Sequence, residues 1–483
     1  MKKIFKYLLL ALLAWNMSAC ESFIDDMEVD PNNPGDATAA RMIEGVMVAD
    51  MFVHTGDLNR LAGMWMGYFT GADRQYLTLD TWGGSVAADY NNTWGNIYTG
   101  VIAQARIVQE KASTENNLRL RGVAKILEAH ALGTTAQLWG DVPNTEANNI
   151  DEFPNPAYES QASVYASLQT LLNSALADLA GVGSIPNDIF YGGSVANWSA
   201  FAHSLKARYF VHTGDFANAE TEAALGITTL SEELWAPFGS TFGATFNPYY
   251  DFMVYNRPGY MGADNAYAAE LLDPYDLSGS GRSRSNAKTN EEARFNWNYL
   301  PYYEIYASGY EPNYLNDFDW AEPNGKFGLE FPLYTAGESL LIIAEARIRA
   351  NDVAGAIAAY NNYRTYLVNG GGGFHDISSA YDYAFQYDPY VLADFQAGGM
   401  VNHGQASAAE AILFEIMEER YVSMVGELEA FSDWRRTNNL IGVPVKFGTS
   451  IPERFLYPQV EINTNPNVPS PLPDFSTPTP VNQ

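Results

Sequence analysis

The position of Cys20, the one cysteine of the chain, implies a specific covalent chemistry. A lysine-bearing start and a mostly apolar stretch from Ile4 to Trp15 precede it, and the small residues Ser18 and Ala19 stand next to it. That order is typical of a bacterial lipoprotein signal peptide, which is cleaved before a cysteine whose thiol carries a diacylglyceryl group. A further acyl chain on the new amino terminus would complete a stable anchor. We therefore expect residues 1–19 to be removed and Cys20 to be lipidated; the alternative is an ordinary cleaved signal followed by an incidental cysteine.

Aromatic side chains outside the helical patterns are the second group that can act on a ligand. The chain is 14% aromatic, with 31 Tyr and 10 Trp, and two groups fall in loop-like sequence, from Tyr76 to Tyr90 and from Tyr249 to Trp320. A Trp or Tyr ring packs on the C–H face of a sugar, while nearby amides and carboxylates bind its hydroxyls. The residues that we predict to bind ligand are Trp82, Tyr90, Tyr255, Tyr260, Trp297, Tyr303 and Trp320. The competing interpretation is that these rings fill the scaffold beneath long loops.

Charged side chains on helices form a third candidate group. Its members, with a neighbouring tryptophan, are Trp139, Asp141, Glu345, Glu419, Arg420, Asp433, Arg435 and Arg436. They could form a catalytic site, but Glu and Arg on facing helices more often make buried bidentate pairs that fix packing. A glycoside hydrolase needs two carboxylates at a defined separation across a cleft, and no sequence feature singles out such a pair. We therefore expect a scaffold role for these residues and no enzymatic activity.

The sequence predicts no cofactor and no metal site. Its six His residues form no His-Glu-x-x-His pair, and the stretch Gly279–Arg284 lacks the Gly-Lys-Ser/Thr ending of a P-loop. Four oxygen-bearing residues could gather around Ca²⁺, namely Asp317, Asp319, Glu322 and Asn324. Their spacing matches no defined calcium loop, so we interpret them as a solvated acidic turn.

Composition excludes several classes of protein. The chain has 27 basic and 57 acidic residues, and removal of residues 1–19, which hold three lysines and no acid, takes the formal charge from −30 to −33. Nucleic-acid binding needs a basic surface that displaces counterions, so that class is excluded. With one cysteine the fold can form no internal disulfide, and no second run of 18 apolar residues predicts a membrane span. The charge also disfavours a sulfated or uronic-acid-rich ligand, unless basic residues such as Arg257, Arg282, Arg284 and Arg294 converge.

The elements that must position these residues are predicted to be helices. Apolar residues recur at helical spacing over residues 38–53, 92–111, 119–139, 161–179, 197–212, 216–230, 338–350, 353–367, 408–424 and 428–437. The tight turn at Asn351–Asp352 and the alanines around it indicate a tetratricopeptide-like hairpin. Residues 231–332 lack this period, and long irregular segments are usually functional. We predict an all-α protein with a tether at 20–37 and one body at 38–483. That body has a helical scaffold at about 38–230 and 333–440, an irregular binding region at about 231–332 and an extended tail at about 441–483.

Four motifs occur in a fixed order along the chain. They are an alanine-bearing helix that ends in Trp139-Gly140-Asp141-Val142-Pro143, the segment Glu338–Ala346, the segment Glu410–Arg436 and the closing segment Arg454–Asn467. Each motif is weak alone, but together they resemble the SusD/RagB family of nutrient-binding outer-membrane lipoproteins of Bacteroidetes. The stretch Asp30–Pro34 resembles the subgroup of that family with short N-terminal regions.

The resemblance implies a tetratricopeptide-like scaffold with an irregular ligand-binding face, anchored through Cys20 in the outer membrane and facing the exterior. It also implies a SusC-like TonB-dependent transporter, over which the protein closes like a lid, and an oligosaccharide that it delivers unaltered. The alternatives are a binding protein for peptides or other nutrients, a secreted glycoside hydrolase, and a helical-repeat adaptor that binds only protein. Because loop lengths vary among relatives, no loop aromatic carries over residue by residue.

Overall fold

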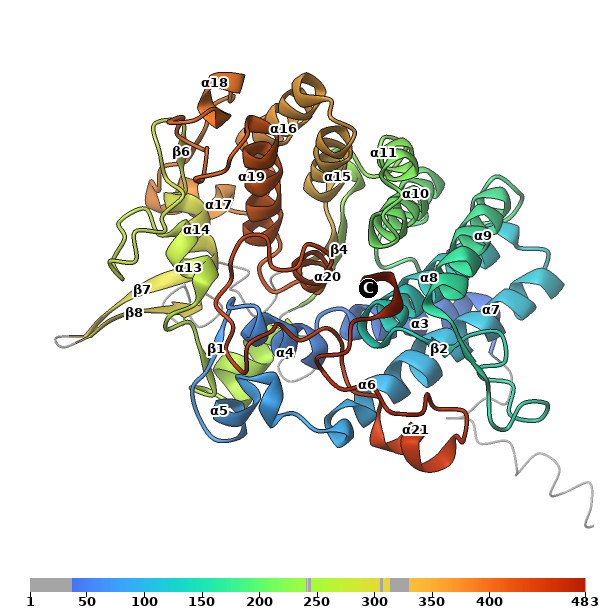
Figure 1. The fold of residues 1–483 in the computed structure, drawn as a ribbon. Helices are drawn as coiled ribbons and strands as arrows, with labels where there is room; N and C mark the ends of the chain where they lie inside the picture. Colours follow the sequence, from blue (N-terminus) through green and yellow to red (C-terminus); the bar gives the residue numbers. More distant parts are fainter. Residues whose placement is uncertain (1–36, 240, 242–244, 305–306, 313–329, 483) are drawn as a thin grey trace, which may run out of the picture.

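The computed structural model describes residues 37–239, 241, 245–304, 307–312 and 330–482 of the chain (Figure 1). Six of the residues singled out above lie outside these ranges: Cys20, Asp317, Asp319, Trp320, Glu322 and Asn324. The predictions for them stay predictions. Within the described ranges, no helix is both long enough and apolar enough to cross a bilayer.

A curved array of helix pairs forms the body of the molecule (Figure 1). In the order in which neighbours pack, its helices are α7 (Ala103–Thr114), α8 (Leu118–Trp139), α9 (Gln161–Leu179), α10 (Val195–His212), α11 (Phe216–Ala223), α15 (Ala336–Arg349), α16 (Val353–Val368) and α19 (Ala408–Ser423). From α7 to α16 each helix packs on its neighbours in this series, as in solenoid proteins, and α19 packs mainly on α15. The predicted all-α fold is thereby confirmed.

Shorter helices surround the array. On the N-terminal side these are α3 (Ala39–Val53), α4 (Asp57–Trp65), α5 (Gln75–Leu79), η2 (Trp82–Gly84), η3 (Ala87–Tyr90), α6 (Asn91–Gly95) and the π-helical η4 (Asn96–Ile102). The middle of the chain holds η5 (Leu230–Glu232), α12 (Pro248–Tyr250), the π-helical η6 (Asp251–Asn256), α13 (Tyr267–Leu272) and α14 (Glu292–Asn298). The C-terminal part adds α17 (His375–Tyr381), α18 (Leu392–Phe395), α20 (Glu429–Arg436), α21 (Gln459–Thr464) and η10 (Pro480–Asn482).

The strands in the described residues are short and pair in antiparallel twos. The pairs are β1 (Thr70–Gly71) with β5 (Met261–Gly262), β2 (Val142–Pro143) with β3 (Tyr158–Glu159), β4 (Leu234–Ala236) with β9 (Phe331–Tyr334), β6 (Thr289–Asn290) with β10 (Gln386–Tyr387), and β7 (Tyr299–Glu304) with β8 (Ala307–Pro312). The β1–β5 and β6–β10 pairs tie the irregular middle of the chain to segments outside it.

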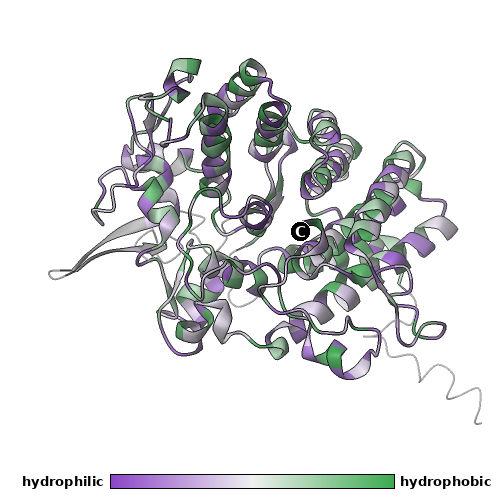
Figure 2. Cartoon of the chain, in the orientation of Figure 1, coloured by the Kyte–Doolittle hydropathy of each residue, from purple (hydrophilic) through white to green (hydrophobic). Residues whose placement is uncertain are grey.

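Local sequence accounts for the long helices. Ser160, Ser194 and Ser407 begin α9, α10 and α19, each accepting a hydrogen bond from the backbone N–H three residues on. In α8, Gly133 allows close packing with α10, because a Cβ there would lie 2.2 Å from the Tyr209 hydroxyl. Figure 2 shows hydrophobic and hydrophilic residues mixed around the helices, as expected of helices that bury one face.

The structure differs from the predicted elements at three places. The helix expected over 216–230 ends at Ala223, because Gly226 lies against Ser204, whose hydroxyl accepts a 2.8 Å hydrogen bond from the Ile227 N–H. The sequence pattern also missed α4 and the π-helical η6, whereas the π-helical η4 lies inside the helix predicted over 92–111. The C-terminal tail, expected to be extended, contains α21 and packs on the scaffold, where the Phe455 N–H donates to the Leu138 carbonyl.

Candidate ligand-binding cleft

An open cleft of about 520 Å³ lies where the end of α3, the start of α4, the α6–η4 junction and η6 meet. We call it the η6 cleft. It is lined by Phe52, Val53, Gly56, Asp57, Arg60, Thr93, Asn96, Pro248, Asp251, Phe252, Asn256 and Arg257. Aromatic faces beside amides, carboxylates and guanidinium groups are the chemistry that a sugar ring requires.

Two phenylalanine rings supply the apolar faces of the cleft. Phe52 is 44% exposed, and Phe252 is half-buried. The guanidinium carbon of Arg60 lies 4.5 Å from the centroid of the Phe252 ring, at cation–π distance. The centroid of the Phe252 ring also lies 4.8 Å from that of the Tyr76 ring. The Phe252 ring is therefore held in place before any ligand arrives.

Polar groups surround these rings. Asp57 pairs with Arg60, and Asp251 accepts a 2.6 Å hydrogen bond from Asn256 Nδ2. Burial opposes the charge of Arg60, but Asp57, Tyr76 and Tyr249 together outweigh it, so the pKa of Arg60 is raised. Arg60 Nε has no hydrogen-bond partner among the described residues, and Arg257 forms no ion pair there. The cleft thus offers both donors and acceptors to hydroxyl groups.

Two local features shape the cleft. Gly56 joins α3 to α4, and a Cβ at this position would lie 2.7 Å from the Phe52 carbonyl oxygen, so a larger residue would spread the two helices. Asn247 caps the turn opposite by accepting a hydrogen bond from the Tyr249 N–H, and Pro248 starts the helix that widens into η6. The Tyr249 hydroxyl then donates a 2.8 Å hydrogen bond to the Gly426 carbonyl and fixes η6 to the scaffold.

Two of the predicted binding residues lie beside this cleft. Tyr255 belongs to η6 and is 45% exposed. Tyr260 is half-buried, with the guanidinium carbons of Arg74 and Arg257 at 5.4 and 5.8 Å from its ring centroid. Its ring centroid is 6.4 Å from that of Phe252. Ligand contact by either residue stays a prediction.

Trp82 and Tyr90, also predicted to bind ligand, are core residues instead. Trp82 is 5% exposed and meets the rings of Trp65 and Phe447 edge to face. Tyr90 is fully buried, and its ring stacks on Phe455 at a centroid distance of 5.1 Å. Both rings fill the scaffold because the C-terminal segment covers them, so neither offers a face to a ligand.

Of the three remaining predicted residues, the structure describes the side chain of Trp297 alone. Trp297 lies on α14 and lines a separate, smaller cavity. Tyr303 lies on β7, paired with Ser308 of β8, where the structure describes the backbone alone. Trp320 is outside the described residues. Conversely, the sequence patterns did not single out Phe52, Arg60 and Phe252, which line the cleft. The position of Phe52 near the end of a predicted helix was a usable signal.

The charged residues of the family-like motifs are buried and paired. Arg436 binds both oxygens of Glu345, at 2.6 and 2.7 Å, and Asp433 lies between Arg436 and Arg420, 2.6 Å from each. These arginines hold the pKa of Glu345 down, at about 2, against the effect of burial. Arg435 donates to backbone carbonyls. Their geometry is that of packing contacts between helices.

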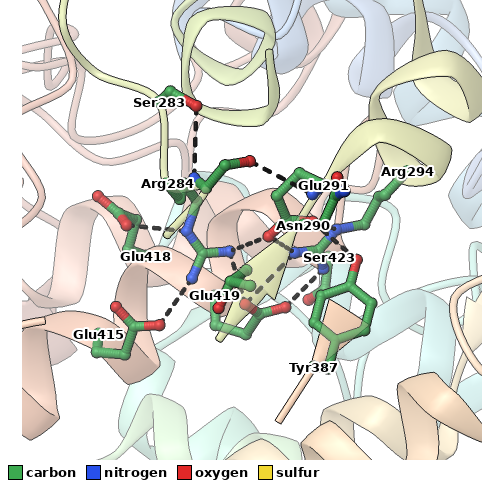
Figure 3. Close-up of polar contacts among 12 residues, drawn as sticks. Ser283, Arg284, Asn290, Glu291, Arg294, Tyr387, Glu415, Glu418, Glu419 and Ser423 are labelled. Atoms are coloured by element: carbon green, nitrogen blue, oxygen red, sulfur yellow. Dashed lines mark hydrogen bonds and ion pairs between the residues drawn. The ribbon is translucent and has the colours of Figure 1, made fainter. Parts of the chain in front are cut away.

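Glu419 belongs to a larger buried network (Figure 3). Arg284 binds four carboxylates in it, those of Glu291, Glu415, Glu418 and Glu419. Arg294 binds Glu291 and Glu419, each at 2.6 Å. Two of the arginines that could have recognised an anionic ligand therefore converge on internal glutamates, and Arg282 pairs with Glu270. Of that set, only Arg257 lines the cleft.

Two groups of described residues bring potential metal ligands together. In one, Asp50, His54 and His130 lie in the core, with the two imidazole rings stacked 3.6 Å apart at 2°. The nitrogen lone pairs of an imidazole lie in its ring plane. Because the two ring planes are parallel and stacked, lone pairs from both rings cannot point at one ion. In the other, His403 and Glu418 flank Glu415, which the Tyr360 hydroxyl and Arg284 already bind. Neither arrangement favours a metal centre.

Comparisons with known proteins place this geometry in a family. The SusD-like family model, described as "Starch-binding associating with outer membrane", matches residues 31–458. A SusD/RagB family protein from Bacteroides thetaiotaomicron is 20% identical, with 92% of this chain and 99% of that one covered and a TM-score of 0.63. A chitin-binding SusD homolog from Flavobacterium johnsoniae is 17% identical, with 91% and 98% covered and a TM-score of 0.63. A SusD homolog from Bacteroides fragilis is 15% identical, with 92% and 100% covered and a TM-score of 0.65.

No curated protein gives a significant match. At these identities the solved structures show a shared helical fold, and the family model spans most of the sequence. The chain therefore belongs to the SusD-like family, which is described as starch-binding and associated with the outer membrane.

Proposed function

We propose that this protein binds an oligosaccharide in the η6 cleft without cleaving it and passes it to a TonB-dependent transporter in the outer membrane. The observation that carries the proposal is the cleft itself, where exposed Phe52 and the fixed Phe252 ring lie among donors and acceptors. The family description and the chitin-binding relative favour a glycan over a peptide as ligand. Anchorage through a lipid on Cys20 and the SusC-like transporter partner are part of the proposal and rest on the sequence.

Calorimetric titration with malto- and chito-oligosaccharides tests the binding step. We expect saturable binding, a loss of about tenfold or more in Phe52→Ala, and no release of reducing ends. Leu392→Ala is the control, because Leu392, like Phe52, is 44% exposed and does not line the cleft. Turnover that disappears in Asp57→Asn or Asp251→Asn would make the protein a hydrolase. Binding of peptides alone would assign it a different nutrient.

The anchor is tested separately. Cys20→Ala should release the protein from the membrane and impair uptake, while glycan affinity of the released protein stays unchanged. A tether of this kind raises the local concentration of the binding protein at the transporter. Full uptake with the protein free in solution would contradict the anchored arrangement.

A further inference from the structure

A second cavity lies between the β4–β9 pair, α14, α16 and the turn that joins α19 to α20. Its volume is about 60 Å³, and it shares no lining residue with the η6 cleft. A water molecule takes up about 30 Å³ in the liquid, so there is room for two waters or one small functional group but not for a sugar ring. We call this cavity the Glu427 pocket.

Glu427 gives the pocket its chemistry. Its side chain lines the cavity and is 8% exposed. The backbone N–H donates to the Met424 carbonyl, yet the carboxyl makes no hydrogen bond or ion pair with any residue that the structure describes. Burial, and then Glu338, raise the pKa of Glu427 well above its usual range. Burying a carboxyl that has no hydrogen-bond or ionic partner costs free energy. A ligand that supplied such a partner would therefore be stabilised in this pocket.

The cations near Glu427 are already engaged. Arg208 is held by Glu338 through two hydrogen bonds of 2.8 and 2.6 Å and lies 3.6 Å from Glu429. Arg294, which lines the pocket, is neutralised within the network of Figure 3. The other titratable groups around Glu427 are Glu330 in the same pocket, Glu233 behind its wall, and His54, His130 and Glu429 on the far side of the carboxyl. The pocket therefore favours a ligand group that carries positive charge.

Aromatic rings form much of the remaining wall. Trp235 and Trp297 are half-buried, and the rings of Tyr363 and Tyr366 lie beside each other at a centroid distance of 5.7 Å. The polar atoms of Trp235 and Tyr366 both donate to Glu233, at 3.0 and 2.7 Å. All four side chains line the cavity, and aromatic rings attract cations.

We propose that the Glu427 pocket binds a primary ammonium group, carried either by an amino sugar or by the amine of a peptide. On binding, the carboxylic acid of Glu427 gives its proton to solvent, and the resulting carboxylate pairs with the ammonium. No other bond forms or breaks. The aromatic walls exclude water from this ion pair and so strengthen it. The site is independent of the η6 cleft and of the identity of the ligand bound there.

The test is calorimetric titration of the full chain with n-propylammonium chloride, against n-propanol as the uncharged control. We expect propylammonium to bind and propanol not to bind, with affinity falling about tenfold for each pH unit below the pKa of Glu427. Titrations in buffers of different ionisation enthalpy should show release of one proton. Glucosamine and a lysine-containing dipeptide, titrated in parallel, distinguish the two sources of the amine.

Glu427→Gln should lower propylammonium affinity at least tenfold, while Phe252→Ala in the η6 cleft should leave it unchanged. Equal binding of propylammonium to the wild type and a folded Glu427→Gln would overturn the proposal. So would equal binding of propanol, or binding without proton release, and these two measurements need no variant. Binding of glucosamine alone or of the dipeptide alone would each support the proposal and name the source.

Discussion

Two aromatic groups of this chain, Tyr76–Tyr90 and the Tyr249–Tyr260 part of the second loop group, differ in how far their rings are covered, although Tyr249 is buried as well. In the Tyr76–Tyr90 group, Tyr76, Trp82 and Tyr90 are all buried. In the Tyr249–Tyr260 group, by contrast, Tyr255 is 45% exposed and Tyr260 is half-buried beside the η6 cleft. Rings from the C-terminal segment pack over Trp82 and Tyr90, whereas Tyr76 packs against Phe252 and Tyr260. An excess of loop aromatics therefore indicates either a core or a binding surface, and the segment that covers them decides which.

Truncation of a buried ring is the strongest test of this comparison. Tyr90→Ala should lower the free energy of unfolding by about 3–5 kcal/mol, as for other large core aromatics, and leave the glycan affinity of the folded protein unchanged. Tyr90→Phe, which keeps the ring and loses a 2.7 Å hydrogen bond with Ser85, should cost about 1 kcal/mol. Urea unfolding measures both. A Tyr90→Ala protein of normal stability and weakened binding would place this ring in the site.

A second prediction concerns acid sensitivity of the scaffold. Burial lowers the pKa of His130 to about 4, so between pH 6.5 and pH 4 the unfolded chain binds a proton that the folded protein does not. Stability should therefore fall as the pH falls through this window, by up to about 3 kcal/mol from this residue. Unfolding of wild type and His130→Asn across that range measures the contribution. Parallel pH profiles of the two proteins would show that His130 does not titrate as expected.

Truncation of a ring that lines the η6 cleft should affect ligand binding instead of stability. Phe252→Ala should weaken glycan affinity about tenfold, or ~1.4 kcal/mol, because a sugar loses one apolar face. Its unfolding free energy should change by less than that of Tyr90→Ala, since the ring is only half-buried. Titration and urea unfolding of the same preparation compare the two. A large loss of stability with unchanged affinity would make Phe252 a second core ring.

The smallest expected effect is at the rim of the cleft. Arg257→Gln should weaken a neutral oligosaccharide about threefold, the effect of one lost hydrogen bond at an exposed position. Arg282→Gln is the control, because that arginine pairs with Glu270 and does not line the cleft. A much larger loss for a uronic-acid oligosaccharide than for a neutral one would show that Arg257 recognises a carboxylate.

The sequence by itself determined the scaffold. Helical periodicity placed most of the helices to within a few residues, because it reports how each helix directs its own side chains toward the core. Motif order identified the family, and the expected pairing of residues such as Glu345 and Arg436 is present as bidentate contacts. These features depend on local spacing, or on residue types that rarely stay unpaired when buried.

Only the tertiary structure decided which surfaces can bind. The η6 cleft forms where Phe52 and Arg60 meet Phe252, and the Glu427 pocket forms where five separate segments converge. The burial of Trp82 likewise depends on Phe447. Each of these contacts joins parts of the chain that are far apart in sequence. Periodicity describes one helix at a time, so it carries no information about which distant segment will cover an aromatic ring or leave it open to a ligand.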